Sequence, residues 1–407
     1  MDDFVAALLT TVVGLITVPV AVFFIEVTAA TATTLARRFG ASAKEVRGTL
    51  RPRIAVLITA HNESVGLTPI LEDVKQQVQP DDRILVVADN CTDDTASIAS
   101  AHGVQVIERR DMTKRDKGFA FDFGIRHLAL DPPEILIMLG ADCRLADNAI
   151  YELAMTCAAT CRPVQALYRM LAPSDSSNNL QVAEFTWRVK NWLRPLGLKA
   201  LGLPCQLMGT GMAFPWDAIR RVDLASSWSV EDLKLGIVLA SQGRHPLFCP
   251  TARVTSQFGA SATAVRTQRA CWEPGHVKMI LSAFPRLLCA AIAARDWRVI
   301  ALALDLTVPP LSLLAIIVAA TLACTAVYAL LGFSSTAFSL CAGTAIAFLV
   351  ATFLAWLTSG RDLITVGDLL LIARYGVDKV RHYRVIVSKQ GPTTWMRIQH
   401  NRDGSLN

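Results

Sequence analysis

Uncharged apolar residues are concentrated in two runs near the ends of the chain. The first run, Phe4–Ile25, holds 22 residues without a charge, which is long enough to cross a hydrocarbon core of about 30 Å as a helix. Asp2 and Asp3 precede it, whereas a secretory signal peptide begins with cations. We therefore predict a retained transmembrane anchor rather than a cleaved signal.

The second run, Leu306–Gly360, holds 55 uncharged residues and is long enough for two helices. We predict spans at about 306–331 and 337–358, separated by a short turn. Pro309 and Pro310 are expected to kink the start of the first of these, because proline lacks a backbone N–H. Neither span carries an ionisable residue, which argues against a transporter.

Residues 51–275 show a different pattern, in which short apolar runs alternate with helix-like segments. The predicted strands are Ile54–Thr59, Arg83–Ala88, Val104–Glu108, Ile135–Leu139 and Val164–Tyr168. The predicted helices cover about 66–79, 117–130 and 146–161, and a further helix is predicted to start near 93–95. Such alternation predicts βαβ units, a mostly parallel sheet and a binding site beyond the carboxyl ends of its strands.

The composition places these elements in a membrane protein. The chain is 52% hydrophobic and 18% charged, with a net charge of +6 and no basic block with interleaved aromatic residues, so no nucleic-acid partner is expected. Lys and Arg follow the first span and the last one, which predicts cytoplasmic locations for both polar segments and an outside N-terminus. The ten cysteines lack CxxC spacing and are expected to be reduced.

Polar clusters follow the predicted strands. The first strand runs into His61 and Glu63 rather than a glycine-rich turn, and the chain has neither GxGxxG nor a P-loop, so dehydrogenase and P-loop NTPase functions are not supported. The second strand ends at Asp89, where a carboxylate can accept a hydrogen bond from a base or a sugar. Asp93 or Thr92, a few residues on, is explained by capping of the next helix.

Two further positions offer phosphate and metal chemistry. Lys117, before Gly118 at a helix start, presents a cation and free amides to a phosphate, although a solvated helix start explains it as well. Asp142 follows the fourth strand in Gly140-Ala141-Asp142 and is a candidate ligand for a hard divalent cation held jointly by a diphosphate.

In this order the motifs resemble those of the membrane-bound, inverting glycosyltransferases of family 2. The motifs are AHNES, ADNCTDDT, DKGFAFDFG, GADC, MGTGMAF, VEDL and QRACWE, over about residues 51–280. The resemblance implies a GT-A fold, a Rossmann-like nucleotide-sugar-binding α/β domain with a mixed, mostly parallel sheet. It also implies a nucleotide-sugar donor, expected to be a UDP-sugar, and Mg²⁺ or Mn²⁺ as cofactor.

The resemblance also implies roles for individual residues. Asp232 matches the catalytic base, and Asp142 matches the last acid of the family's DxD motif, which binds the metal with the donor diphosphate. The implied nucleotide-sugar site comprises Ala60, His61, Glu63, Asp89, Lys117 and Asp142. The implied acceptor and diphosphate site comprises Gly209, Thr210, Gly211, Glu231, Gln268, Arg269 and Trp272. Helix capping by an acid explains Glu231 equally well, and for Asp232 it is the weaker explanation.

The chain departs from the family pattern at two positions. Gly140 stands where DxD has its first acid, which is expected to weaken donor binding or to shift metal dependence. Cys271 stands where the QxxRW segment has arginine, so the role of Trp272 is better supported than that of a cation.

The predicted organisation has five parts. These are an anchor (1–35), a cytoplasmic GT-A domain (51–275), an interfacial helix (276–300), two transmembrane helices (301–360) and a basic cytoplasmic tail with an interfacial helix (361–407). We expect a multi-pass inner-membrane hexosyltransferase that acts on a lipid-linked or growing glycan acceptor in exopolysaccharide biosynthesis. The alternatives are a glycolipid glycosyltransferase acting on ceramide or diacylglycerol, and a catalytically inactive scaffold subunit.

Overall fold

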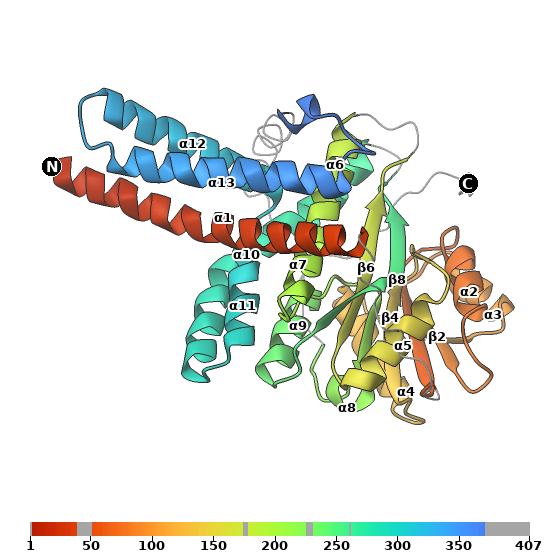
Figure 1. Ribbon diagram of the computed structural model, residues 1–407. Helices are drawn as coiled ribbons and strands as arrows, with labels where there is room; N and C mark the ends of the chain where they lie inside the picture. The colour runs from red at the N-terminus through yellow and green to blue at the C-terminus, as the bar shows by residue number, and fades with distance from the viewer. Residues whose placement is uncertain (1, 39–50, 174–177, 225–230, 260–261, 371–407) are drawn as a thin grey trace. The chain divides into compact units, whose positions relative to one another are not determined.

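The computed structural model describes residues 2–38, 51–173, 178–224, 231–259 and 262–370. The chain divides into two compact units, and each is described here by itself. The helical unit comprises residues 1–43, 175–203 and 277–389, and the α/β unit comprises 44–174, 204–276 and 390–407. Figure 1 labels the helices and strands.

The α/β unit contains one sheet of eight strands in the order β3-β2-β1-β4-β7-β6-β8-β5. The strands are β1 (Ile54–Ala60), β2 (Arg83–Asp89), β3 (Gln105–Arg109), β4 (Ile135–Gly140), β5 (Arg144–Leu145), β6 (Val164–Leu171), β7 (Met212–Pro215) and β8 (Leu247–Gln257). β3, β2, β1 and β4 are parallel, β7 is antiparallel to both of its neighbours, and β8 is parallel to β6. The predicted mixed and mostly parallel sheet is confirmed.

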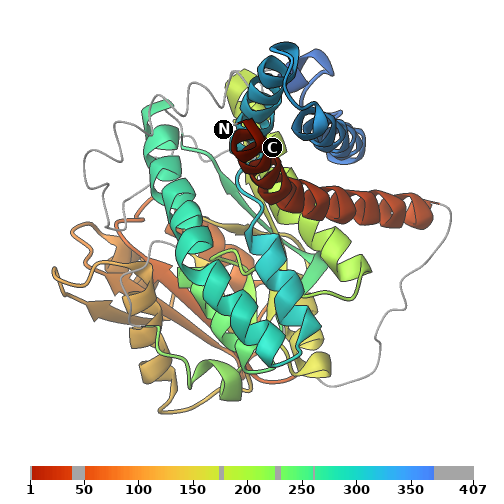
Figure 2. The same ribbon diagram turned by 90° about the vertical axis from the view of Figure 1, so that its left-hand side faces the viewer.

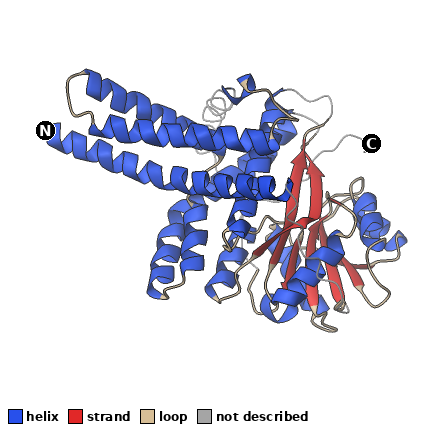
Figure 3. Ribbon diagram, viewed as in Figure 1, coloured by secondary structure: helices blue, strands red, loops and turns tan. Residues whose placement is uncertain are grey.

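Helices cover the sheet because its central strands are apolar along their whole length (Figure 3). They are α2 (Leu67–Lys75), α3 (Thr95–Ala101), α4 (Lys117–Leu128), α5 (Ala149–Thr160), α8 (Trp216–Ile219) and α9 (Glu231–Ser241). All seven residues of β1 are buried, as expected of a parallel strand with two covered faces. Leu57 of β1 lies in one core cluster with Phe121 of α4 and Leu239 of α9. This packing fixes α4, which carries Lys117, and α9, which carries Glu231 and Asp232.

The helical unit contains the long apolar helices. Its elements are α1 (Asp2–Arg38), α6 (Asn178–Arg188), the π-helical segment η1 (Val189–Leu193), α7 (Arg194–Ala200), α11 (Trp297–Leu306), α12 (Leu311–Leu330), α13 (Thr336–Ser359) and the 3₁₀ turn η2 (Gly367–Leu370). The boundary between the units falls within α10 (Ala262–Ala293).

Four segments of the described chain are long and apolar enough to cross a membrane, whereas the hydrophobic runs predicted three. The additional segment is Gly275–Ala293 of α10, and its mean hydropathy of 1.4 is below the 2.1–2.5 of the other three. It contains Lys278 and Arg286, and these charges interrupted the pattern in the sequence. The predicted interfacial helix of the basic tail lies largely in 371–407, outside the described residues.

Pro309 and Pro310 do not kink a membrane span, as had been expected from the sequence. Instead of kinking a span that starts at residue 306, they separate two helices, because α11 ends at Leu306 and α12 begins directly after Pro310. Pro310 is the N-cap of α12, where the missing N–H of proline has no helical partner to lose.

Small and hydroxylated side chains join the long helices of this unit. α1 and α13 lie side by side in Figures 1 and 2, and hydroxyl pairs connect them at Thr17–Thr344 (2.9 Å) and Thr31–Thr358 (3.1 Å). α7 meets α1 at Gly197, where an added Cβ would lie 1.9 Å from the Glu26 carbonyl oxygen. Only glycine allows this approach.

A buried charge cluster joins three helices of the helical unit next to this contact. Arg194 of α7 donates through Nε to Glu26 Oε2 of α1 (2.6 Å) and through Nη2 to the Asp305 carboxylate and carbonyl of α11. All three residues are at least nine-tenths buried. Glu26 Oε1 has no hydrogen-bond partner among the described residues. Removing one member of such a buried cluster is expected to be costly, because it leaves an uncompensated buried charge.

Candidate active site

Three loops of the α/β unit meet at one edge of the sheet. β1 pairs with β2 through Ala60 and Ala88 and with β4 through Thr59 and Gly140, all in parallel register. The segments after these strands therefore leave the sheet on the same side. They carry the predicted residues His61, Asp89 and Asp142, so the sheet brings the predicted donor-site loops together.

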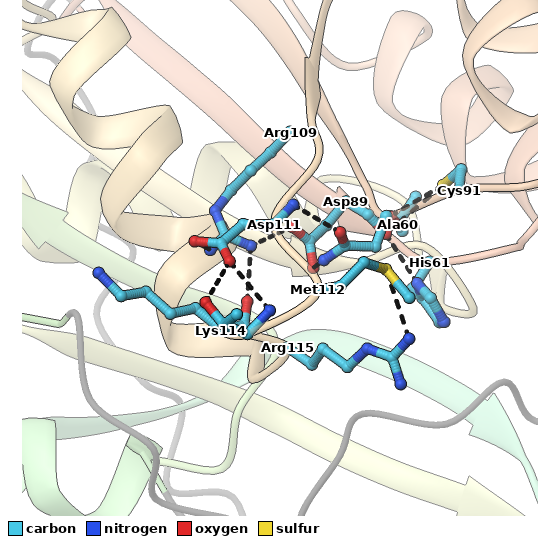
Figure 4. Close-up of polar contacts among 11 residues, drawn as sticks. Ala60, His61, Asp89, Cys91, Arg109, Asp111, Met112, Lys114 and Arg115 are labelled. Carbon is cyan, nitrogen blue, oxygen red and sulfur yellow. Dashed lines mark hydrogen bonds and ion pairs between the residues drawn. The ribbon is translucent and has the colours of Figure 1, made fainter.

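Asp89 lies at the tip of β2 in a polar cluster (Figure 4). Its Oδ1 accepts from Arg109 Nη1 at 2.6 Å and its Oδ2 from Asn90 Nδ2 at 3.1 Å, and its side chain is 1% exposed. Burial raises the pKa of Asp89, and this effect outweighs the Arg109 guanidinium, which lowers it. His61 Nδ1 donates to the Asp89 carbonyl at 2.7 Å. Asp89 is thus fixed in position by side chains from neighbouring elements.

Arg109 was not among the predicted site residues, although it is central to this cluster. It pairs with Asp89 because the two residues are directly opposite in the β2–β3 ladder. Its guanidinium also contacts the Lys114 carbonyl at 2.8 Å, Asp111 at 3.2 Å and the Phe119 ring at 5.5 Å. The pairing of β2 with β3 therefore shows that Arg109 belongs to this cluster. In the sequence Arg109 stands in a run of charged residues after a predicted strand, which did not indicate this role.

The β1–α2 loop is held by the β2–α3 loop. The backbone N–H of Glu63 donates to Thr95 Oγ1 at 2.8 Å, and that of Ser64 donates to Asp93 Oδ2 at 3.2 Å. Burial raises the pKa of Asp93, but hydrogen bonds from Thr95 and Ser64 outweigh it, and the net shift is downward. Asp93 also accepts from the Thr95 backbone N–H at the start of α3 (3.1 Å), although the N-cap residue of that helix is Asp94 rather than the predicted Thr92 or Asp93.

The side chains of Lys117, Asp142 and Asp232 meet around two glycines. Lys117 Nζ, at the start of α4, donates to the Gly209 carbonyl at 3.0 Å. A Cβ added to Gly209 would lie 3.3 Å from Asp232 Oδ2, and one added to Gly140 would lie 2.8 Å from Asp142 Oδ1 and 3.7 Å from Lys117 Nζ. A cation and two carboxylates therefore surround one small volume.

The turn that carries this arrangement needs its glycines. Gly209 has φ +80° and Gly211 has φ +65°, a backbone region that other residues rarely adopt. At Gly211 an added Cβ would also lie within 3 Å of Val254 and Ala166 side-chain atoms. Gln165 Oε1 accepts from the Met208 N–H at 2.8 Å, and Gln165 Nε2 donates to the Thr210 carbonyl at 2.9 Å. These two bonds hold the turn in place.

Thr210 points away from the solvent-facing part of the site. Its side-chain Oγ1 accepts from the buried Gly140 N–H at 3.0 Å and lies 3.2 Å from Cys143 Sγ, which in turn lies 3.3 Å from Ser256 Oγ. Tyr168, also buried, shares a hydrogen bond with Ser256. Burial raises the pKa of Cys143 to about 12, so this residue is a neutral thiol at physiological pH.

This buried layer lies beneath the loop that carries Asp142. The family resemblance named Thr210 as an acceptor or diphosphate residue, but nothing in the sequence indicated that it would lie in one buried cluster with Cys143 and Ser256. A cysteine after a candidate metal ligand, a threonine between two glycines and a serine in a strand have no shared pattern. They come together because β5, which directly follows Cys143, pairs with β8, which carries Ser256, and because Thr210 lies just before β7, the strand next to β4.

The carboxylates fit a cation that takes most of its ligands from the substrate. Among the described residues no three His, Cys, Asp or Glu side chains form a metal-binding cluster. Mg²⁺ and similar hard ions are often held by one or two carboxylates plus substrate phosphates and water. Asp142 supplies one carboxylate, and the Glu63 carboxylate lies near the backbone of Asp142, since a Cβ added to Gly66 would be 3.2 Å from Glu63 Oε2 and 4.0 Å from the Asp142 Cα.

The remaining predicted residues are placed as follows. Ala60 is fully buried at the end of β1, and its carbonyl accepts weakly from Cys91 Sγ at 3.5 Å. Glu231 is in α9, and Gln268, Arg269 and Trp272 are in α10, but the side chains of these four lie outside the part of the chain that the structure describes.

The sheet and its site define an α/β fold with a polar site at the carboxyl ends of its parallel strands. The profile of the glycosyltransferase-like family 2 matches residues 52–275, more than half of the chain. The protein is therefore a member of the glycosyltransferase-like family 2, and the predicted family and fold class are confirmed. A comparison with curated proteins finds no significant match.

Solved structures with a similar course of the chain are themselves glycosyltransferases. One is a mannosyltransferase of Pyrobaculum calidifontis in complex with GDP-Man and Mn²⁺, at 18% identity, a TM-score of 0.48, and coverage of 85% of this chain and 97% of that one. Another is the glucosyl-3-phosphoglycerate synthase of Mycobacterium tuberculosis with Mn²⁺, UDP and glucosyl-3-phosphoglycerate, at 16% identity, a TM-score of 0.33, and coverage of 52% and 77%.

Proposed function

We propose that this protein is a membrane glycosyltransferase that transfers a sugar with inversion from a nucleotide-sugar, a UDP-sugar, to a lipid-linked or growing glycan acceptor. The observation that carries the proposal is the meeting of Lys117, Asp142 and Asp232 around Gly209 and Gly140. An in-line displacement from a diphosphate needs a base, a carboxylate that can bind a metal cation, and a positively charged side chain. Asp232, Asp142 and Lys117 can supply these groups.

In the proposed reaction Asp232 takes the proton of the acceptor hydroxyl. The hydroxyl oxygen then attacks the anomeric carbon from the side opposite the diphosphate, and the bond between that carbon and the phosphate oxygen breaks. The bonding electrons remain on the leaving nucleoside diphosphate. Lys117 stabilises this developing charge through its ammonium group.

The nucleotide is proposed to bind over the carboxyl ends of β1 and β2. Asp89 offers acceptor oxygens to the base, and Arg109, Asn90 and His61 hold it in place. Such preorganisation aids binding because the site need not rearrange around the ligand. Mg²⁺ or Mn²⁺, when bound by Asp142 with Glu63 nearby and by the donor diphosphate, supplies Lewis-acid stabilisation of the leaving group. The Mn²⁺ in the two similar structures supports this assignment.

The acceptor is proposed to be held at a bilayer surface. Four segments with the length and composition of membrane spans support membrane association of the chain. Lys278 and Arg286 within α10 favour a helix that lies in the cytoplasmic interface beside an anionic headgroup layer. An exopolysaccharide repeat assembled on a lipid carrier at the inner membrane, with the catalytic domain in the cytoplasm, is the specific proposal.

A transfer assay tests the proposal. The full chain in lipid nanodiscs is given a panel of UDP- and GDP-sugars, Mg²⁺ or Mn²⁺, and polyprenyl-phosphate-linked, ceramide and diacylglycerol acceptors, and products are read by mass spectrometry. We expect a mass gain of one sugar on a polyprenyl-linked acceptor. A gain on ceramide or diacylglycerol alone would identify the glycolipid enzyme instead.

A matched pair of variants separates catalysis from folding in this assay. Asp232→Asn removes the base, whereas Asp217→Asn changes an acid whose side chain is 66% exposed and pairs only with Arg220 on the surface of α8. We expect the rate of transfer to fall by about 10²–10⁴-fold in the first and to persist in the second. If wild type and both variants are silent with every donor while all remain folded, the protein is an inactive scaffold and the proposal is wrong.

A further inference from the structure

The end of β4 differs from the family pattern in a way that the structure makes interpretable. Gly140 is buried and stands where the DxD motif has its first acid. An added Cβ would lie 2.8 Å from Asp142 Oδ1, 3.4 Å from Cys143 Sγ and 3.7 Å from Lys117 Nζ. A side chain at position 140 would therefore point into the volume between the Asp142 carboxylate and the Lys117 ammonium.

Lys117 is held at this volume by neutral partners. Its Nζ donates to the Gly209 carbonyl at 3.0 Å and lies 5.3 Å from the centre of the Phe121 ring. Among the described residues no carboxylate pairs with it within 4.0 Å. The carbonyl and the ring orient the ammonium without cancelling its charge, so its attraction for an anion is kept.

An aspartate at position 140 would change the charge balance. Its carboxylate would extend from a Cβ that is already 3.7 Å from Lys117 Nζ, close enough to pair with the ammonium. It would also add a carboxylate beside that of Asp142, in a volume that the Asp232 carboxylate already borders, and neighbouring carboxylates repel one another and a diphosphate unless a divalent cation lies between them. With glycine at position 140, neither the pairing with Lys117 nor the added repulsion between carboxylates occurs.

We propose that Gly140 reserves the Lys117 ammonium for the donor diphosphate, so that this protein binds a nucleoside diphosphate through Lys117 without requiring a divalent cation. The inference rests on the proposed function and gives Gly140 a positive role in that site. A bound cation strengthens the affinity, but the site does not depend on it.

Calorimetric titration of UDP and GDP into the full chain in nanodiscs tests this, in EDTA and in Mn²⁺. We expect wild type to bind one nucleotide in EDTA with an affinity within about tenfold of that in Mn²⁺. Lys117→Gln should lose tenfold or more of the affinity in EDTA, whereas Lys117→Arg should keep most of it, because charge and reach are conserved.

Position 140 provides a matched pair of variants. Gly140→Asp and Gly140→Asn add side chains of nearly the same volume, but only the first adds a charge. We expect Gly140→Asp to weaken binding in EDTA at least tenfold more than Gly140→Asn does, and Mn²⁺ to restore most of the difference. Thermal unfolding of each variant confirms that it is folded.

The outcomes distinguish this inference from the proposed function. If wild type binds either nucleotide only in Mn²⁺, or if the Asp and Asn variants weaken binding equally, Lys117 does not replace the cation and the inference is overturned. If wild type binds neither nucleotide even in Mn²⁺, the proposed function itself is contradicted.

Discussion

Replacing Arg109 by leucine is expected to destabilise the α/β unit strongly. The change removes the guanidinium that bonds to Asp89 at 2.6 Å, and the two side chains are 10% and 1% exposed. Breaking a buried ion pair in this way leaves a carboxylate without its cation and costs about 3–5 kcal/mol. For a domain of this size that corresponds to roughly 6–20 °C in melting temperature.

The neighbouring Arg110 is the matched control. Its side chain is 79% exposed and pairs with Glu108, which is itself 52% exposed, and such surface pairs contribute about 0–1 kcal/mol. Arg110→Leu should therefore melt within a few degrees of wild type. The assay is thermal unfolding of the full chain in detergent, followed by tryptophan fluorescence.

The loss in Arg109→Leu is also expected to depend on pH. Burial already raises the pKa of Asp89, and removal of the guanidinium, which lowers it, raises the pKa further. A carboxyl group with a raised pKa in the folded state binds a proton more tightly there than in the unfolded state. The folded protein is therefore more stable at low pH, and this contribution is lost as pH rises through the raised pKa. The gap between the variant and wild type should narrow from pH 8 to pH 5. A melting temperature equal to that of Arg110→Leu, or a gap independent of pH, would refute the reasoning.

Three further experiments, two by substitution and one by chemical labelling, test the packing. Thr210→Val removes the acceptor of the buried Gly140 N–H and should cost about 1–3 kcal/mol in unfolding free energy, whereas Thr210→Ser keeps the oxygen and should cost less; equal melting temperatures would contradict this. Gly197→Ala puts a Cβ 1.9 Å from the Glu26 carbonyl and should destabilise the helical unit by about 1–3 kcal/mol or more, and an unchanged melting temperature would count against the close contact. Cys143, with its pKa raised to about 12, should resist iodoacetamide at pH 8 while the exposed Cys161 reacts, as peptide mass mapping would show; equal labelling would mean that Cys143 is accessible.

The strands could be predicted because their apolar runs are short and regularly separated by helix-like segments. The runs at 54–59 and 135–139 lie within one residue of β1 and β4 at each end. Because the strands were predicted to be parallel, the residues after them could also be assigned to one edge of the sheet. The family resemblance implied that Lys117 and Asp142 share one site, and a Cβ added to Gly140 would lie within 3.7 Å of side-chain atoms of both.

The partners of these residues could not be predicted, because they depend on register and three-dimensional packing. Arg109 meets Asp89 only through the β2–β3 ladder, and Thr210 meets Gly140 only because the glycine turn lies against β4. The span count differed for another reason. Because Lys278 and Arg286 interrupt its apolar run, the segment 276–300 was predicted as an interfacial helix, whereas Gly275–Ala293 of α10 is long and apolar enough to count as a possible span.

The most direct test of the central claim is a comparison of nucleotide binding with sugar transfer in Asp232→Asn. Asp232 is proposed to act on the acceptor proton and not on the nucleotide, so the variant should bind UDP or GDP within a few-fold of wild type. Its rate of transfer should fall by about 10²–10⁴-fold, the usual contribution of a general base. A variant that transfers sugar at the rate of wild type would contradict the account.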